Sequence, residues 1–143
     1  MTKPAHRAQT AQALVETALV IPVMFALMLG FLAVLVRVEA QVELETATTL
    51  AAVAAVSAPA NDDYDSRRFA TETYIGTLHS YPYLEPGTLS GCGGYAPGQT
   101  VRCEGRAVLR YSRTPMALVV PFDIPIQVSA DAQSSTYRSE GSR

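Results

Sequence analysis

Hydrophobic residues are concentrated in one uninterrupted run near the N-terminus, whereas the rest of the chain mixes hydrophobic and polar positions. Residues 17–36 are twenty positions without a charged side chain, with Glu16 just before them and Arg37 just after them. At a rise of about 1.5 Å per residue, a helix of that length matches the roughly 30 Å hydrocarbon core of a bilayer. The pattern therefore predicts one transmembrane helix with a single carboxylate at its entrance.

The residues after Arg37 are expected to continue the same helix. Residues 37–56 are rich in alanine and contain neither glycine nor proline, a composition that favours helix. A helix from about residue 13 to residue 56 would be roughly 66 Å long. Pro22 removes one backbone hydrogen bond from it, which predicts a bend or a locally loosened segment. Two hydrophobic stripes follow helical spacing: Val38 with Val42, and later Leu50, Val53 and Val56.

A short acidic run follows this helix and raises a calcium hypothesis. Asn61, Asp63 and Asp65 occupy alternating positions, and Glu72 stands where a twelve-residue calcium loop would place its closing acid. Against it, Ser66 occupies the position of the glycine that such a loop needs, and two arginines follow directly. Calcium binding is therefore the weaker of two interpretations.

The preferred interpretation is a second helix, from about Ser66 to His79. Asp63 or Asp65 would cap its start, where acidic side chains are favourable. Its inward-facing stripe would consist of Ala70, Tyr74 and Leu78.

Residues 80–100 are expected to form an irregular loop. They contain three prolines and five glycines, with turns predicted at residues 86–87 and 97–98. Tyr81, Tyr83 and Tyr95 could serve as contact aromatics, although tyrosine commonly packs its ring while its hydroxyl reaches water.

Two later segments alternate between hydrophobic and polar residues with the period of a half-buried strand. They cover residues 101–111 and 122–131, and prolines interrupt the connection between them. Pro125 lies inside the second segment and assigns it to a sheet edge or a broken strand. We therefore expect the two segments to form an antiparallel hairpin that covers a helix. The predicted fold class is α+β, with a small head on a long helical stalk.

The charges on either side of the apolar run predict its orientation. Lys3, His6 and Arg7 precede it without an acidic residue, which places the N-terminus in the cytoplasm and the head outside. Thiols are normally oxidised there, so Cys92 and Cys103 are predicted to form a disulfide, typically worth ~2–4 kcal/mol. A cleaved secretory signal is the alternative, but its apolar region is usually only about 7–15 residues long.

The start of the apolar run resembles the class III signal of type IV pilins, and more narrowly that of TadE-like minor pilins of the Tad (tight adherence) system. The resemblance rests on residues 11–16, Ala-Gln-Ala-Leu-Val-Glu, and on Pro22, six residues after Glu16. It implies that a basic leader is cleaved between Ala11 and Gln12. The new α-amino group at Gln12 could then neutralise the Glu16 carboxylate of a neighbouring subunit in an apolar bundle.

The resemblance implies a structural protein, a minor pilin or pseudopilin of an adhesion pilus. Its partners would be other pilins, a prepilin peptidase, an inner-membrane assembly platform and membrane lipid. The rival is an uncleaved single-pass membrane protein whose head binds a ligand or an extracellular partner. An enzyme has little support, because His79 has no Ser or Cys motif around it. Eleven Lys and Arg against thirteen Asp and Glu give no electrostatic argument for nucleic acid.

The sequence therefore divides into four parts. Residues 1–11 form a cytoplasmic basic leader, and residues 12–57 form the transmembrane and stalk helix. Residues 58–133 form the extracytoplasmic α+β head, and residues 134–143 form a polar tail that is expected to fray. No cofactor is expected, and two cysteines cannot supply a four-ligand zinc site.

Overall fold

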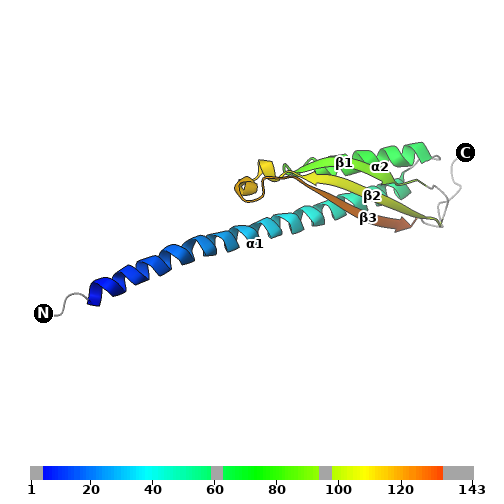
Figure 1. Cartoon of the computed structure of the whole chain (residues 1–143). Coiled ribbons are helices and arrows are strands. Elements are labelled where there is room, and N and C mark those ends of the chain that lie inside the picture. The colour runs from blue at the N-terminus through cyan, green and yellow to red at the C-terminus, as the bar shows by residue number, and fades with distance from the viewer. Residues whose placement is uncertain (1–4, 59–62, 94–97, 134–143) are drawn as a thin grey trace, which may run out of the picture.

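The computed structural model describes residues 5–58, 63–93 and 98–133, except for the side chains of residues 5–13 and 118. One long helix carries a small head at its C-terminal end (Figure 1). Lys3, Asn61, Tyr95 and the polar tail lie outside the described residues. The elements are α1 (Ala5–Ser57), α2 (Asp63–Leu78), β1 (Leu84–Gly91), β2 (Thr100–Leu109), the 3₁₀ helices η1 (Tyr111–Arg113) and η2 (Pro115–Leu118), and β3 (Ile124–Gln133).

Helix α1 confirms the predicted continuous helix and extends it at its start. Its 53 residues would measure about 80 Å at the ideal rise. It begins before the expected residue 13 and ends at Ser57, one residue after the expected end. The backbone stays helical through Pro22, and Figure 1 shows α1 as one gently curved rod. The first half of α1 is a free stalk, and the second half belongs to the head.

The sheet contains three antiparallel strands in the order β1-β2-β3. Central strand β2 buries alternate residues against the two helices, whereas the residues between them, mostly charged, face away from the helices. Both edge strands contain a proline, Pro86 in β1 and Pro125 in β3, while β2 has none. Proline cannot donate to a ladder and is therefore confined to such edges. The predicted hairpin of β2 and β3 is confirmed, with Pro125 opposite Val108.

Strand β1 corrects the prediction of an irregular loop over residues 80–100. Pro86 and Gly87 were expected in a turn, yet they belong to β1, and the register shifts between Pro86 and Leu89. A bulge of this kind lets an edge strand accommodate a proline. A Cβ atom on Gly87 would lie 2.6 Å from the Arg106 carbonyl oxygen, so glycine permits the close approach of the two strands.

Helix α2 confirms the inward stripe that the sequence predicts. Ala70, Tyr74 and Leu78 are fully buried. The helix begins at Asp63, however, so Asp63 and Asp65 lie inside its first turn and not before it. Their negative charges are still favourable there, because the helix dipole is positive at that end.

The head packs on a face of α1 that is made of small residues. Its buried positions are Ala40, Leu44, Ala47, Thr48, Ala51, Ala52 and Ala55. The predicted stripes of Val38, Val42, Leu50 and Val53 remain largely exposed on the other side, and Val56 is half-buried. Thr48 of α1 lies against Gly105 of β2, where a Cβ atom would collide with the Thr48 hydroxyl. Tyr74 packs on the same glycine and donates a hydrogen bond to the Arg106 carbonyl at 2.6 Å.

Candidate assembly and membrane-contact site

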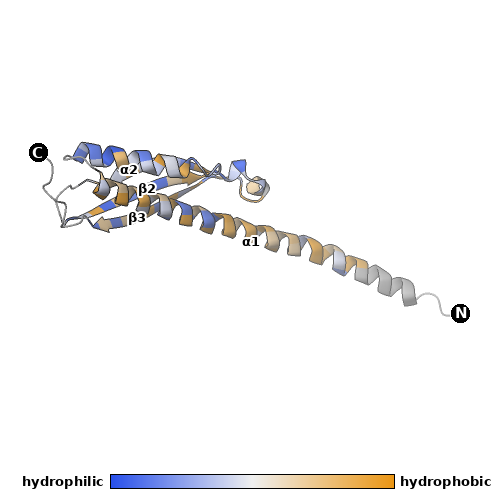
Figure 2. Ribbon diagram, turned by 180° about the vertical axis from the view of Figure 1, so that it is seen from behind, coloured by the Kyte–Doolittle hydropathy of each residue, from blue (hydrophilic) through white to orange (hydrophobic). Residues whose placement is uncertain are grey.

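The free part of α1 presents hydrophobic side chains on all sides. Every residue from 14 to 28 is exposed, and most are large and apolar, as the orange colour along the stalk in Figure 2 shows. Helix α1 is therefore long and apolar enough to cross a membrane, although a signal sequence near the N-terminus would pass the same test of length and composition.

The predicted assembly residues lie along this exposed stalk. The backbone of Ala11 and Gln12 is helical, so the candidate cleavage bond lies inside α1, two turns after the helix begins. Glu16 is exposed one turn later, and it takes part in none of the ion pairs among the residues whose side chains the structure describes. Pro22 follows within the apolar run. The carboxylate of Glu16 therefore projects from the helix next to hydrophobic side chains.

A second apolar surface continues beyond Arg37 on the face of α1 opposite the head. Val38 is 51% exposed and Val42 is 54% exposed, and Leu50 and Val53 are nearly as accessible. Leu35 and Phe31 extend the same face into the apolar run, because they precede Val38 by about one and two helical turns, respectively. We call these six residues the outer face of α1. It runs from the stalk to the level of the head, with the exposed Thr46 and Thr49 between Val42 and Leu50.

Ion pairs link the ends of the three strands that lie nearest the stalk. Arg110, just after β2, donates hydrogen bonds to Glu85 of β1 and, at 3.0 Å, to Asp123, just before β3. Ser112 also donates to Asp123, at 3.3 Å. The pKa of the Arg110 guanidinium is raised, chiefly by its hydrogen bond with Glu85 and next by its hydrogen bond with Asp123. Partial burial by itself would raise the pKa of the Asp123 carboxyl. Its hydrogen bonds with Arg110 and Ser112 outweigh this effect, so the pKa is lowered.

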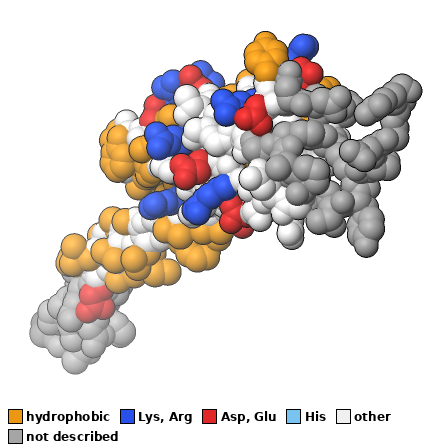
Figure 3. Space-filling model, turned by 90° about the vertical axis from the view of Figure 1, so that its right-hand side faces the viewer, with side chains coloured by type: hydrophobic (Ala, Val, Ile, Leu, Met, Phe, Trp, Pro, Cys, Tyr) orange, Lys and Arg blue, Asp and Glu red, His pale blue; other side chains and the backbone are white. Residues whose placement is uncertain are grey.

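This Arg110 cluster of Glu85, Arg110, Ser112 and Asp123 was missed by sequence reasoning. Arg110 alternates with hydrophobic residues in the β2 segment, a pattern that indicated only a solvated strand face. Its partners lie 25 and 13 residues away in the sequence. Only the pairing of all three strands brings the two carboxylates to one guanidinium, so no local signal could have found the cluster. Figure 3 shows one face of the molecule, on which acidic and basic side chains of the head are interleaved.

A groove of about 410 Å³ lies where the stalk joins the head. Helix α1, the segment before β1 and η2 contribute its walls. At its edge the Tyr81 hydroxyl donates a hydrogen bond to the Glu43 carboxylate, and this bond together with partial desolvation raises the pKa of Tyr81. The sequence had marked Tyr81 and Tyr83 as possible contact aromatics, and both line this groove. Its main apolar lining residues are Leu32, Val36, Ala40, Leu84, Leu109 and Met116.

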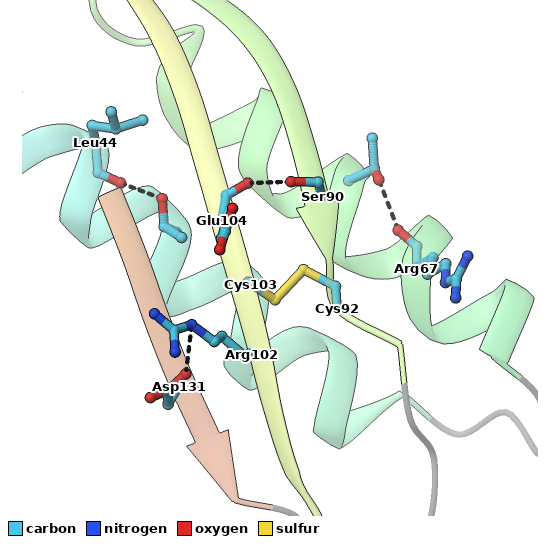
Figure 4. Close-up of a disulfide and its surroundings, with 10 residues drawn as sticks. Leu44, Arg67, Ser90, Cys92, Arg102, Cys103, Glu104 and Asp131 are labelled. Atoms are coloured by element: carbon cyan, nitrogen blue, oxygen red, sulfur yellow. Dashed lines mark hydrogen bonds and ion pairs between the residues drawn. A yellow bond between two sulfur atoms is a disulfide. The ribbon is translucent and has the colours of Figure 1, made fainter. Parts of the chain in front are cut away.

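The disulfide closes the opposite end of the sheet. The sulfur atoms of Cys92, just after β1, and Cys103 of β2 are bonded, with Cα atoms 4.6 Å apart (Figure 4). The Cys92 amide also donates a hydrogen bond to the Arg102 carbonyl at 2.9 Å. Gly91 and Cys92 both have positive φ, which turns the chain out of β1 at this point. The predicted pairing of the two cysteines is therefore confirmed.

The segment considered for calcium has a different conformation from a calcium loop. Residues from Asp63 onward are helical, and Glu72 pairs with Arg68 at 2.9 Å on the surface of α2. The Arg67 guanidinium nitrogen Nη2 likewise lies 4.0 Å from Oδ2 of Asp63, as an ion pair on the same helix. In the described part of the chain, no three His, Cys, Asp or Glu side chains are grouped so that they could hold a metal ion.

These features define a class of protein: a disulfide-linked α+β head at the C-terminal end of one helix that is long and apolar enough to span a membrane. Comparison with protein-family models, curated proteins and solved structures found no match to this chain.

Proposed function

We propose that this chain is a TadE-like minor pilin or pseudopilin, inserted in the cytoplasmic membrane by α1 and trimmed between Ala11 and Gln12. It would take part in assembling a Tad-type adhesion pilus, with the head outside the cell. The observation that carries this proposal is Glu16, a lone exposed carboxylate at the entrance of an apolar helix that continues into a stalk.

The position of Glu16 supports an assembly role on energetic grounds. An acidic side chain in the middle of a bilayer costs roughly 2.5–3.5 kcal/mol, so a carboxylate near the hydrocarbon is costly unless a cation pairs with it. A cleaved chain would carry a new cation at Gln12. The pair would favour one axial stagger between neighbouring subunits, because leaving either charge buried alone costs more than the pair gains.

The outer face of α1 supports packing between subunits. Its valines are exposed although they lie beyond the apolar run, at the level of the head. A solvent-exposed stripe of this kind is typical of a surface that a partner covers. Other pilins, whose apolar helices would lie parallel to α1, are the proposed partners, together with a prepilin peptidase and an inner-membrane assembly platform.

One observation favours the second candidate, an uncleaved single-pass protein whose head binds a ligand. The groove at the junction of stalk and head is lined mainly by apolar side chains and has two carboxylates, Glu39 and Glu43, at its edge. Pockets of about 300–1,000 Å³ with few polar groups are common ligand sites. Cleavage separates the two candidates, because only the pilin requires it.

The intact mass of the membrane-extracted protein tests the cleavage. The pilin proposal expects a chain that begins at Gln12. A chain that still contains Lys3 would reject processing at this bond and leave the single-pass candidate as the better description.

A matched pair of substitutions tests the assembly role. Glu16→Ala should leave membrane insertion intact but reduce copurification with other pilins, and Glu16→Asp should retain part of it. Glu72→Ala removes an exposed carboxylate from α2, away from the stalk, and should change neither property. Equal recovery of partners with wild type and Glu16→Ala would remove the pairing role from Glu16.

A further inference from the structure

The head begins beside the apolar run of α1 and not beyond it. Ala33 belongs to the run, yet it is only 9% exposed, and its carbonyl oxygen accepts a hydrogen bond from the Tyr111 hydroxyl at 2.8 Å. Leu29 and Gly30 are already partly buried, whereas residues 14–28 are all exposed. The part of α1 that the head leaves free therefore ends at about Leu29, eight residues before Arg37.

The uncharged portion of this free segment, which begins after Glu16, is too short to cross a bilayer by itself. Residues 17–28 span about 18 Å at the ideal helical rise, against a hydrocarbon core of about 30 Å. Residues 17–36 do span about 30 Å. Moving the membrane toward the N-terminus would instead bury Glu16 and Gln12 in hydrocarbon, which is costly. A bilayer that starts at Glu16 must therefore reach Arg37, and its outer 12 Å or so would lie beside the head.

The head presents a suitable surface at this level. Residues 114–122, which include η2, contain no charged side chain, and we call them the apolar turn. In Figure 1 this gold and orange segment points back along the stalk. Phe122 is 62% exposed and Val119 is 41% exposed. Arg113 and Asp123 flank the turn, so its apolar surface ends sharply at charged residues.

From this overlap we infer that the apolar turn inserts into the outer boundary of the bilayer, where Phe122 and Val119 contact lipid acyl chains. The inference rests on the membrane placement within the proposed function, and it adds a second membrane contact to α1. Apolar surfaces of peripheral segments commonly penetrate about 5–10 Å into this boundary. Arg37 and Arg113 would lie at the headgroups, where cationic side chains attract anionic lipid. Two contacts would fix the tilt of the head against the membrane.

Tryptophan fluorescence of the full chain tests this contact, because the protein has no tryptophan of its own. Three single variants are reconstituted in vesicles of phosphatidylethanolamine and phosphatidylglycerol, with or without lipids brominated on their acyl chains. Phe122→Trp reports on the apolar turn. Phe25→Trp reports on the stalk, where Phe25 is 61% exposed. Tyr64→Trp is the control, since Tyr64 is 73% exposed in the first turn of α2, at the end of the head far from the stalk.

The inference expects blue-shifted emission and bromolipid quenching for Phe122→Trp and Phe25→Trp, and neither for Tyr64→Trp. All three positions are exposed, so the folded head should tolerate each change, and circular dichroism checks this. Quenching of Phe25→Trp together with a Phe122→Trp signal like that of Tyr64→Trp would overturn the lipid contact and leave the proposed function standing. Absence of quenching in all three variants would overturn both the contact and the membrane placement on which it rests.

Discussion

The contact between Thr48 and Gly105 sets the spacing between α1 and the sheet, and adding one methyl group, in Gly105→Ala, tests this idea. A Cβ atom on Gly105 would lie well inside 3.0 Å from the Thr48 hydroxyl oxygen and at 3.0 Å from Cε2 of Tyr74. Neither neighbour can move freely. The Thr48 hydroxyl donates to the Leu44 carbonyl at 2.7 Å, and the Tyr74 hydroxyl is tied to Arg106.

The expected cost of Gly105→Ala follows from three terms. Overpacking a filled interior typically costs about 1–3 kcal/mol, and displacing the Thr48 hydroxyl would forfeit a hydrogen bond worth about 0.5–1.5 kcal/mol. Replacing a strand glycine by alanine returns roughly 0.5–1 kcal/mol of conformational entropy. The steric terms exceed the entropic one, so the free energy of unfolding should fall by about 1–3 kcal/mol.

Gly76→Ala supplies the matched control. Gly76 lies in α2, and a Cβ atom there would have no neighbour within 4 Å. Only the entropic term applies, so this variant should be more stable than wild type by about 0.5–1 kcal/mol. The same chemical change should therefore have opposite signs at the two glycines.

Urea unfolding of the detergent-solubilised chain measures these differences, with near-ultraviolet circular dichroism of the buried tyrosines as the signal. Thr48→Ala should relieve part of the Gly105→Ala penalty, since the two side chains collide, and a double-mutant cycle would then show a coupling energy of about 1–2 kcal/mol. If Gly105→Ala unfolds at the same urea concentration as wild type, this glycine does not set the helix–sheet spacing and the reasoning is wrong.

Three further predictions concern the cross-links of the head, each measured as the urea midpoint. Replacing both Cys92 and Cys103 by serine should cost about 2–4 kcal/mol, and a smaller loss would show that the unfolded chain gains little freedom. The pKa of Asp123 is lowered in the folded state, so its ionised carboxylate contributes to stability above the ordinary value of 3.8, and this contribution disappears as pH falls through the lowered value. Asp123→Asn should flatten this acid dependence of the urea midpoint, as should Arg110→Ala. Burial raises the pKa of Tyr74 to about 12, although its hydrogen bond to the backbone opposes the shift. Stability should therefore fall as pH rises above about 10, the pKa of tyrosine in the unfolded chain. Tyr74→Phe should show no such alkaline loss from this site.

The elements with a strong period could be predicted from the sequence, and those held by distant partners could not. The stripe of Ala70, Tyr74 and Leu78 has helical spacing, so it identified the buried face of α2 directly. The alternation in β2 and β3 likewise identified their inward residues. Both predictions succeeded because the burial of each side chain depends on the geometry of its own element.

Strand β1 shows where local information fails. Its residues 86–87, Pro-Gly, are a strong turn signal, yet the strand forms because β2 supplies a partner along its length. The disulfide holds the far end of this pair, and Glu85 binds Arg110 at the near end. Tertiary pairing therefore overrides the local preference of the chain, as it often does in strands.

The two faces of α1 show that a period can locate stripes without saying which stripe is buried. Valine and alanine both recur at helical spacing beyond Arg37, and hydrophobicity alone favours the valines for the core. The buried face instead contains Ala47, Thr48 and Ala51, and Thr48 approaches Gly105 of the sheet closely. A valine face turned toward the sheet would hold the backbones apart. The larger hydrophobic residues are therefore left on the outer face, where they remain available to a neighbouring helix.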